Sequence, residues 1–162
     1  LVSRLLFFAR SGYEERRPVD LNAVVRETLA LVRGQAVAQG VTLQMELAPH
    51  LPSVSGSAQA LQQVVLNLAT NALQAMPKGG TLRCQSRTLD GLSRLELSVA
   101  DTGPGIAPAD WTHLFEPFWT TRPEGTGLGL ALCREIVQQH GGQIELDIHP
   151  GWGAVFRVTL PL

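Results

Sequence analysis

Two glycine-rich stretches decide the fold of this chain: Asp101-Thr102-Gly103-Pro104-Gly105-Ile106 and, further along, Gly125-Thr126-Gly127-Leu128-Gly129-Leu130. The first follows an alternating run over residues 95–100, which is typical of a strand, and it sets one carboxylate beside two glycines and a proline. The second opens an apolar run over residues 130–137, which indicates a helix. Glycines before a helix leave N–H groups unpaired, and these groups and the helix dipole attract phosphate. The two stretches together predict a nucleotide site.

The segment between the two glycine stretches is predicted to be the lid of this site. Residues 114–122 read Leu-Phe-Glu-Pro-Phe-Trp-Thr-Thr-Arg, which is too irregular for a packed element and too aromatic for a passive linker. The Gly-x-Gly-x-Gly pattern is neither the dinucleotide fingerprint nor a P-loop, because it lacks the Gly-Lys-Ser/Thr ending and does not follow a strand. A tight turn would explain either glycine cluster alone, so the prediction depends on their joint presence.

A helix predicted from about Ser57 to Met76 carries the third informative pattern. Its apolar face comprises Leu61, Val64, Val65, Leu68, Ala72 and Met76. The opposite side carries a stripe of neutral amides, which are Gln63, Asn67, Asn71 and Gln74. Neutral amides are unusual on a solvated helix face, and asparagine is a poor helix former. Two interpretations stay open: hydrogen bonds to a neighbouring loop, or binding of a hard cation such as Mg²⁺ and of phosphate.

The remaining patterns predict helices and strands that form one mixed sheet. A short strand over residues 19–21 precedes a helix that Asn22 caps, that runs to about Gln39 and that Gly40 terminates. Further strands are expected over residues 41–47, 81–88, 92–100, 143–148 and 154–160, with a hairpin turn at Asp90-Gly91. This order favours an α+β fold in which about three helices cover a single face of the sheet.

Length and composition fit one globular domain with a short appendage. The chain of 162 residues can bury a core, and its 44% hydrophobic and 17% charged residues give no disorder signature. A formal net charge of −1 gives no reason to expect binding to nucleic acid or to an anionic membrane. Cys84 and Cys133 form no metal pattern, and no apolar run reaches the roughly 20 residues of a membrane span, so we expect reduced thiols in a cytoplasmic protein.

The first 17 residues are predicted to be the appendage. Residues 1–10 are mostly apolar and read as the end of a longer helix from an upstream element, with a disordered end as the alternative. Residues 11–17 are polar and precede Pro18, as a linker would. The main domain is therefore expected over residues 18–162.

Taken together, the motifs resemble those of the ATP-binding catalytic domain of two-component sensor histidine kinases of the nitrogen-regulation type. These domains belong to the superfamily of gyrase, Hsp90, histidine kinases and MutL. The family's N box is similar to residues 61–72, its F box to residues 114–118, and its two glycine boxes to residues 101–106 and 125–130. The four motifs occur in the family's order, and residues 5–10 resemble the end of its dimerisation hairpin.

The resemblance implies the Bergerat ATP-binding fold, a two-layer α/β sandwich, and it implies roles for the matching residues. Asp101 would accept a hydrogen bond from the adenine amino group, and Asn71 would bind Mg²⁺ with Asn67 assisting. The backbone of residues 127–129 would cradle the phosphates, while Arg122, in place of the family's Lys, would bind the γ-phosphate through its planar fork. The implied catalytic residues are Asn67 and Arg122. The implied nucleotide-binding residues are Asn67, Asn71, Asp101, Gly103, Gly105, Ile106, Phe118, Thr120, Thr121, Arg122, Gly125, Thr126, Gly127, Leu128, Gly129 and Leu130.

The resemblance also implies an activity and partners. A domain of this kind transfers the ATP γ-phosphoryl group to a histidine on an upstream dimerisation domain, for relay to the receiver domain of a response regulator. The parent protein would be a homodimer, and this part of it is expected in the cytoplasm, in contact with neither nucleic acid nor membrane. No acceptor motif surrounds His50, His113, His140 or His149, so the acceptor histidine is expected to lie outside this fragment.

Two departures from the family pattern and three rival functions bear on this interpretation. Gln74 replaces a common Lys, so one phosphate contact is expected to be missing or supplied by Arg122, and Gly153-Ala154 replaces a common Gly-Thr. An ATPase of the same superfamily is disfavoured, because Asn67 stands where its water-activating Glu would be. The F box and the helix remnant speak against an anti-sigma-type serine kinase. A nucleotide-sensing scaffold that does no chemistry stays open.

Overall fold

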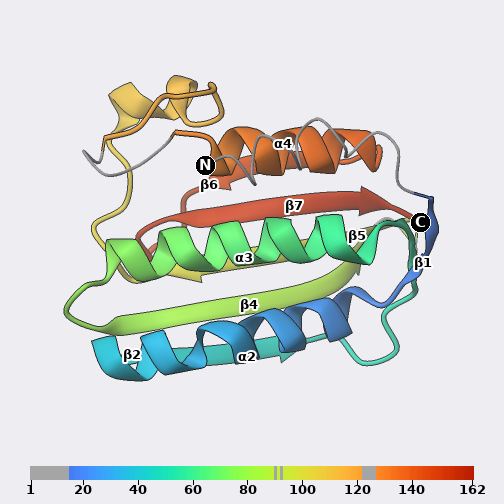
Figure 1. Ribbon diagram of the computed structural model, residues 1–162, viewed down its shortest axis with the longest axis horizontal. Helices are drawn as coiled ribbons and strands as arrows, with labels where there is room; N and C mark the ends of the chain where they lie inside the picture. The colour runs from blue at the N-terminus through green and yellow to red at the C-terminus, as the bar shows by residue number, and fades with distance from the viewer. Residues whose placement is uncertain (1–14, 90, 92, 122–126) are drawn as a thin grey trace.

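Three helices cover one face of a five-stranded sheet in the computed structural model, which describes residues 15–89, 91, 93–121 and 127–162 (Figure 1). The helices are α2 (Leu21–Gln39), α3 (Ala58–Ala75) and α4 (Gly129–Gln139). The strands are β2 (Val41–Leu47), β4 (Gly80–Leu89), β5 (Arg94–Asp101), β6 (Gln143–Asp147) and β7 (Val155–Pro161). The sheet order is β2-β4-β5-β7-β6, and β2–β4 is its parallel pair. The predicted two-layer α/β sandwich with a mixed sheet is confirmed.

Helix α2 begins before the predicted cap. Asp20 is the N-cap, and its Oδ1 accepts a hydrogen bond from Ala23 N at 3.2 Å. Asn22 lies in the first turn, where its Nδ2 donates to Ala48 O at 2.8 Å and its Oδ1 accepts from Ser86 Oγ at 2.7 Å. The prediction of Asn22 as the cap is therefore wrong. Its amide is buried between α2 and the sheet, and the carboxylate of Asp20, two residues earlier, caps the helix. The terminating role of Gly40, which has φ 76°, is confirmed.

A second, two-stranded sheet lies beside the sandwich and was not predicted. Strand β1 (Arg17–Val19) pairs antiparallel with β3 (Val54–Gly56). The short strand expected over residues 19–21 thus ends at its first residue, since Leu21 already belongs to α2. The Arg16 guanidinium donates to Ser55 O at 3.3 Å and also to Gln139 O, so the end of the predicted linker is fixed against β3 and α4. The predicted upstream helix, residues 1–10, lies outside the described residues.

The hydrophobic core fills the space between the three helices and the sheet. Every residue of the apolar face predicted for α3 is at most 4% exposed, which confirms that face. Helix α2 buries Val24, Val25, Leu29 and Val32, but Leu31 is 64% exposed and does not belong to its apolar face. No helix of the described residues is long and apolar enough to cross a bilayer.

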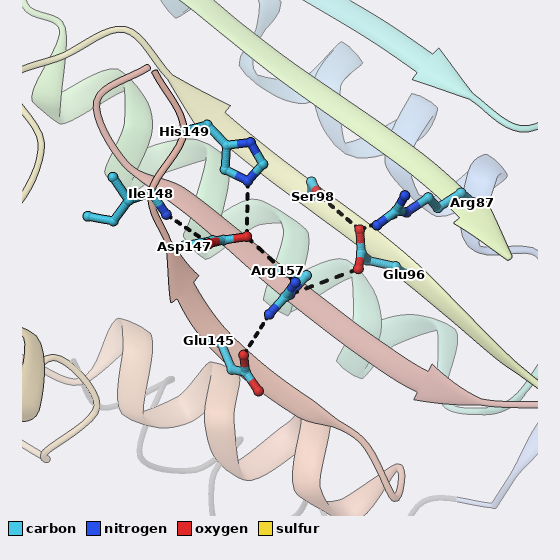
Figure 2. Close-up of polar contacts among 8 residues, drawn as sticks. All are labelled: Arg87, Glu96, Ser98, Glu145, Asp147, Ile148, His149 and Arg157. Carbon is cyan, nitrogen blue, oxygen red and sulfur yellow. Dashed lines mark hydrogen bonds and ion pairs between the residues drawn. The ribbon is translucent and has the colours of Figure 1, made fainter. Parts of the chain in front are cut away.

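The opposite face of the sheet carries charged side chains and, over the described residues, no helix (Figures 1 and 2). Arg87 Nε lies 3.0 Å from Glu96 Oε1, and Arg157 Nη2 lies 2.8 Å from Glu145 Oε2. Arg157 also approaches Glu96 and Asp147, so that β4, β5, β7 and β6 share one network of charges. A solvated, charged face is typical of a mostly antiparallel sheet that has helices on one side.

Helices α3 and α4 run antiparallel and are tied together by polar contacts (Figure 1). At the start of α3, Ser57 N donates to Nε2 of the buried His140 at 3.1 Å, and His140 Nδ1 lies 2.7 Å from Ile136 O. These partners fix the neutral imidazole with its proton on Nδ1. Further along, Cys133 Sγ lies 3.7 Å from Val64 O. His140 is the C-terminal cap of α4.

We predict that Gly56→Ala destabilises the domain by about 1–3 kcal/mol, as overpacking does in a dense core. A Cβ at Gly56 would lie 2.2 Å from Cδ2 of His140, whose ring cannot turn away without breaking two hydrogen bonds. Gly34→Ala is the matched control, because nothing lies within 4 Å of a Cβ there. In urea unfolding we expect the control to gain about 0.5–1 kcal/mol. Equal effects of the two substitutions would contradict the proposed clash.

Candidate functional site

A cavity of about 760 Å³ opens between α3, the start of α4, the end of β5 and the segment that precedes α4. Residues from both glycine stretches and from the amide helix line it, although they are far apart in the sequence. The lining residues include Asn67, Asn71, Gln74, Val99, Asp101, Gly105, Ile106, Trp119, Thr120, Thr121, Gly127, Gly129, Leu130, Ala154 and Phe156. The volume is in the range of small-molecule sites.

Asp101 is the carboxylate of this cavity, and it is 5% exposed at the end of β5. Its Oδ1 accepts hydrogen bonds from Gly103 N at 2.9 Å and from Ala154 N at 3.4 Å. Over the described residues, Oδ2 receives no hydrogen bond. Burial raises the pKa of Asp101, and the two backbone hydrogen bonds act against that rise. The side chain is thus held in one orientation with an oxygen left to accept from a ligand.

Glycines bring three backbone segments close to Asp101. A Cβ at Gly103 would lie 2.8 Å from Ala75 O, and one at Gly153 would lie 2.3 Å from Gly103 O. Gly105 has φ 78° and packs against the backbone of Gly153. A larger residue at Gly103 or Gly153 would push apart the turn before β7, the end of α3 and the first glycine stretch.

The amide stripe of α3 has two kinds of members: in the part of the protein that the structure describes, some make hydrogen bonds, and others line the cavity without one. Asn67 is 3% exposed; its Nδ2 donates to Gly129 O at 3.3 Å, and its Oδ1 accepts from Gln63 Nε2 at 2.9 Å. Asn71 and Gln74 line the cavity, and within the described residues neither side chain makes a hydrogen bond. The hydrogen-bonding interpretation is confirmed for Asn67, which joins α3 to the start of α4 and accepts from Gln63. Asn71 lines the cavity, and binding of a cation and of phosphate by the stripe stays a prediction.

The lid segment contributes to the cavity as far as it is described. Trp119, Thr120 and Thr121 line it, and the Trp119 ring stacks on His113 with a centroid distance of 5.9 Å. Phe118 N donates to Gly127 O at 2.9 Å, which joins the lid segment to the second glycine stretch. Phe118 has φ 67°, and a Cβ at Gly127 would lie 2.2 Å from Phe118 C, so this contact requires glycine.

The structure brings together most of the predicted site residues that it describes. The predicted residues that line the cavity are Asn67, Asn71, Asp101, Gly105, Ile106, Thr120, Thr121, Gly127, Gly129 and Leu130. Gly103 and Leu128 lie next to lining residues, while Phe118 is 67% exposed and does not line the cavity. Arg122, Gly125 and Thr126 lie outside the described residues. Sequence reasoning missed Val99, Phe156 and Ala154, whose only signal was the alternation of their strands.

The residues present fit a Mg²⁺ ion that a triphosphate helps to hold. No group of three or more His, Cys, Asp or Glu side chains within the described residues could bind a metal alone. Mg²⁺ usually takes one or two protein oxygens together with substrate phosphates and water, and the half-buried Asn71 amide offers such an oxygen. The oxygen of Asn67 keeps one lone pair beside its bond from Gln63, so it could assist.

Comparison with known proteins assigns the family. Residues 56–162 match the family described as histidine kinase-, DNA gyrase B-, and HSP90-like ATPase. The chain belongs to this family. Among its relatives are the sensor histidine kinase ZraS of Klebsiella oxytoca, 37% identical over all of the chain, and the signal transduction histidine-protein kinase AtoS of Escherichia coli, 38% identical over the same length. The chain spans 35% and 26% of these two proteins.

Solved structures of this ATPase family have the same architecture. Full-length ShkA in complex with AMPPNP is 32% identical with a TM-score of 0.85, and the match covers 99% of this chain and 35% of that one. The nucleotide-free catalytic domain of the histidine kinase ThkA is 29% identical with a TM-score of 0.83, and the match covers 91% and 96% of the two chains. The chain is thus a histidine-kinase-type ATP-binding domain of the family, and the gyrase-type alternative is not favoured.

Proposed function

We propose that this chain is the catalytic domain of a sensor histidine kinase, which binds Mg-ATP and transfers its γ-phosphoryl group to a histidine on an upstream dimerisation domain. One observation carries the proposal: Asp101, Asn71 and the backbone of Gly127 and Gly129 line the same cavity. A carboxylate, an amide and a helix N-terminus suit the base, the metal and the phosphates of one nucleotide. The response regulator that receives the phosphoryl group, and a homodimeric parent protein, belong to the same proposal.

In this proposal Asp101 reads the base. An ionised carboxylate accepts the hydrogen bond of an exocyclic amino group, which adenine has and hypoxanthine lacks. The surroundings are partly apolar, since Val99, Ile106 and Phe156 also line the cavity, and water is therefore a weaker competitor for that hydrogen bond. The bonds from Gly103 and Ala154 hold the carboxylate ready before the base arrives.

The proposed triphosphate end lies at the start of α4. The backbone N–H groups from Gly127 to Gly129 would meet the phosphates, as at other helix N-termini. Asn71, with Asn67 assisting, would hold Mg²⁺, which neutralises charge on the phosphates when bound. The guanidinium of Arg122 would donate two parallel hydrogen bonds to the γ-phosphate and add a positive charge there. Phosphoryl transfer needs mainly this positioning and charge neutralisation.

We predict that Asp101→Asn weakens ATP binding by about 10- to 100-fold, as expected for loss of a hydrogen bond to a charged group. Preference for ATP over inosine triphosphate should disappear in the same variant. Because burial raises the pKa of Asp101, the wild-type affinity should fall with decreasing pH at a higher pH than for an exposed aspartate. Calorimetric titration over a pH series measures all three effects. An equally steep fall in Asp101→Asn would contradict the role of Asp101.

We predict that Asn71→Ala removes much of the effect of Mg²⁺ on nucleotide affinity. The amide oxygen is lost, while phosphate contacts to the backbone of α4 remain. Calorimetric titration with ATP, with and without Mg²⁺, gives the ratio of the two affinities for each variant. Gln62→Ala is the control, since it removes an amide from the same helix outside the cavity. An unchanged ratio in Asn71→Ala would exclude Asn71 as a ligand.

The kinase activity itself is tested by supplying an acceptor. We expect the chain, incubated with γ-labelled ATP and the acceptor domain of its parent protein, to transfer label to a histidine of that domain. Incubated alone, the chain should bind ATP and stay unlabelled, since His140 is buried with both ring nitrogens engaged and His50, His113 and His149 carry no acceptor motif. Label on the chain alone would contradict the proposal, and binding without transfer would favour a nucleotide-sensing scaffold.

A further inference from the structure

The connection between β6 and β7 makes contacts at both of its ends with residues of the sheet. At its start, Asp147 Oδ1 accepts from Ile148 N at 2.9 Å, and Asp147 Oδ2 lies 3.0 Å from His149 Nε2 (Figure 2). Arg157 Nη1 lies 3.6 Å from the same Oδ2 (Figure 2). At its end, the Trp152 ring lies under the guanidinium of Arg83, with Arg83 Cζ 4.0 Å from the ring centroid.

Arg83, on which Trp152 stacks, lies in a row with two buried apolar residues of this otherwise charged face. Arg83 pairs with Ala100 across β4 and β5, and Ala100 pairs with Val155 across β5 and β7, so the three side chains form one row. Ala100 is 1% exposed and Val155 3% exposed, although no helix of the described residues lies on this side. The Trp152 ring stacks on Arg83, the first residue of this row. Arg83 Nε is itself buried and makes no hydrogen bond within the described residues, as expected for a guanidinium stacked flat on a ring.

The residues that follow Trp152 contact the carboxylate of the site. Gly153 N donates to Asp101 O at 2.7 Å, and Asp101 N donates to Ala154 O at 3.0 Å. Ala154 N donates to Asp101 Oδ1 at 3.4 Å. Because Gly153 and Gly105 lie in direct backbone contact, a displacement of the turn would also move the first glycine stretch.

We propose that Trp152, braced by Arg83, is a positioning residue for base recognition: it presses Gly153 and Ala154 onto Asp101 from the far face of the sheet. Neither side chain lines the cavity, so both act through the backbone of the turn. This inference rests on the proposed function, in which Asp101 reads the adenine amino group. Ala154 has no side-chain hydroxyl, so the turn acts on Asp101 through backbone hydrogen bonds, whose geometry depends on where the turn is held.

The test compares the affinities for ATP and inosine triphosphate, which differ at the group that Asp101 would read. We expect Trp152→Leu and Arg83→Met to lower the preference for ATP about tenfold, as for one misaligned hydrogen bond. Trp152→Phe keeps an aromatic face under the guanidinium and should restore the preference. Arg87→Met is the matched control, since Arg87 is on the same strand and face but pairs with Glu96. Its preference should equal that of the wild type.

The outcomes separate this inference from the proposed function. A merely structural role of Trp152 would weaken both nucleotides equally and leave their ratio unchanged, which would overturn the inference. The same ratio in Arg83→Met and Arg87→Met would also overturn it, and this comparison serves if Trp152→Leu fails to fold. If the wild-type chain does not bind ATP, or does not prefer it over inosine triphosphate, the proposed role of Asp101 fails first and the inference fails with it.

Discussion

The antiparallel register of α3 and α4 is the constraint on which the site depends. Three contacts set it along the two helices: Ser57 with His140, Val64 with Cys133, and Asn67 with Gly129. The contact between Ser57 and His140 joins the two helices at the end away from the cavity, and the contact between Asn67 and Gly129 joins them beside it. A shift of α4 by one turn would carry its N-terminus about 5 Å along α3 and away from Asn71. The polar ties fix this register, which apolar packing alone would specify less sharply.

The described part of the cavity offers a negatively charged ligand mainly the partial positive charges of dipoles. Among the described residues that line it, none is a lysine or an arginine, and the acidic one, Asp101, is held by backbone N–H groups. Helix-end amides and side-chain amides carry partial charges, so they can bind a polyanion without the desolvation that a buried ammonium group would require. The full positive charges at the proposed phosphate end would come from a bound metal and from Arg122, which lies outside the described residues.

Sequence reasoning was most successful where a local pattern carries the chemistry. The apolar face of α3, its amide stripe and Asp101 at the end of a strand could all be recognised, because helical and strand periodicity place these residues without knowledge of distant contacts. The same holds for Gly40 and for the β4–β5 hairpin. The four motifs then supplied the fold as a whole, since their order is specific to one family.

Features that depend on distant contacts could not be predicted. Asn22 has the composition of a helix cap, but its amide is taken by Ala48 and Ser86, which only the folded chain brings near. Strand β3 is three residues long, follows two prolines and pairs with β1, so its own sequence has no strand period. Trp152 looks like an ordinary turn aromatic until Arg83 is seen stacked on its ring.

The contact between Gly56 and His140 has a consequence for how the sequence can diverge. The imidazole occupies the space that a side chain at position 56 would need, and the same ring joins the start of α3 to the end of α4. The two positions are therefore not independent during evolution. A lineage that loses the histidine gains room at position 56, whereas a lineage that keeps it must keep the glycine, so substitutions at the two sites should appear as a correlated pair among related kinases.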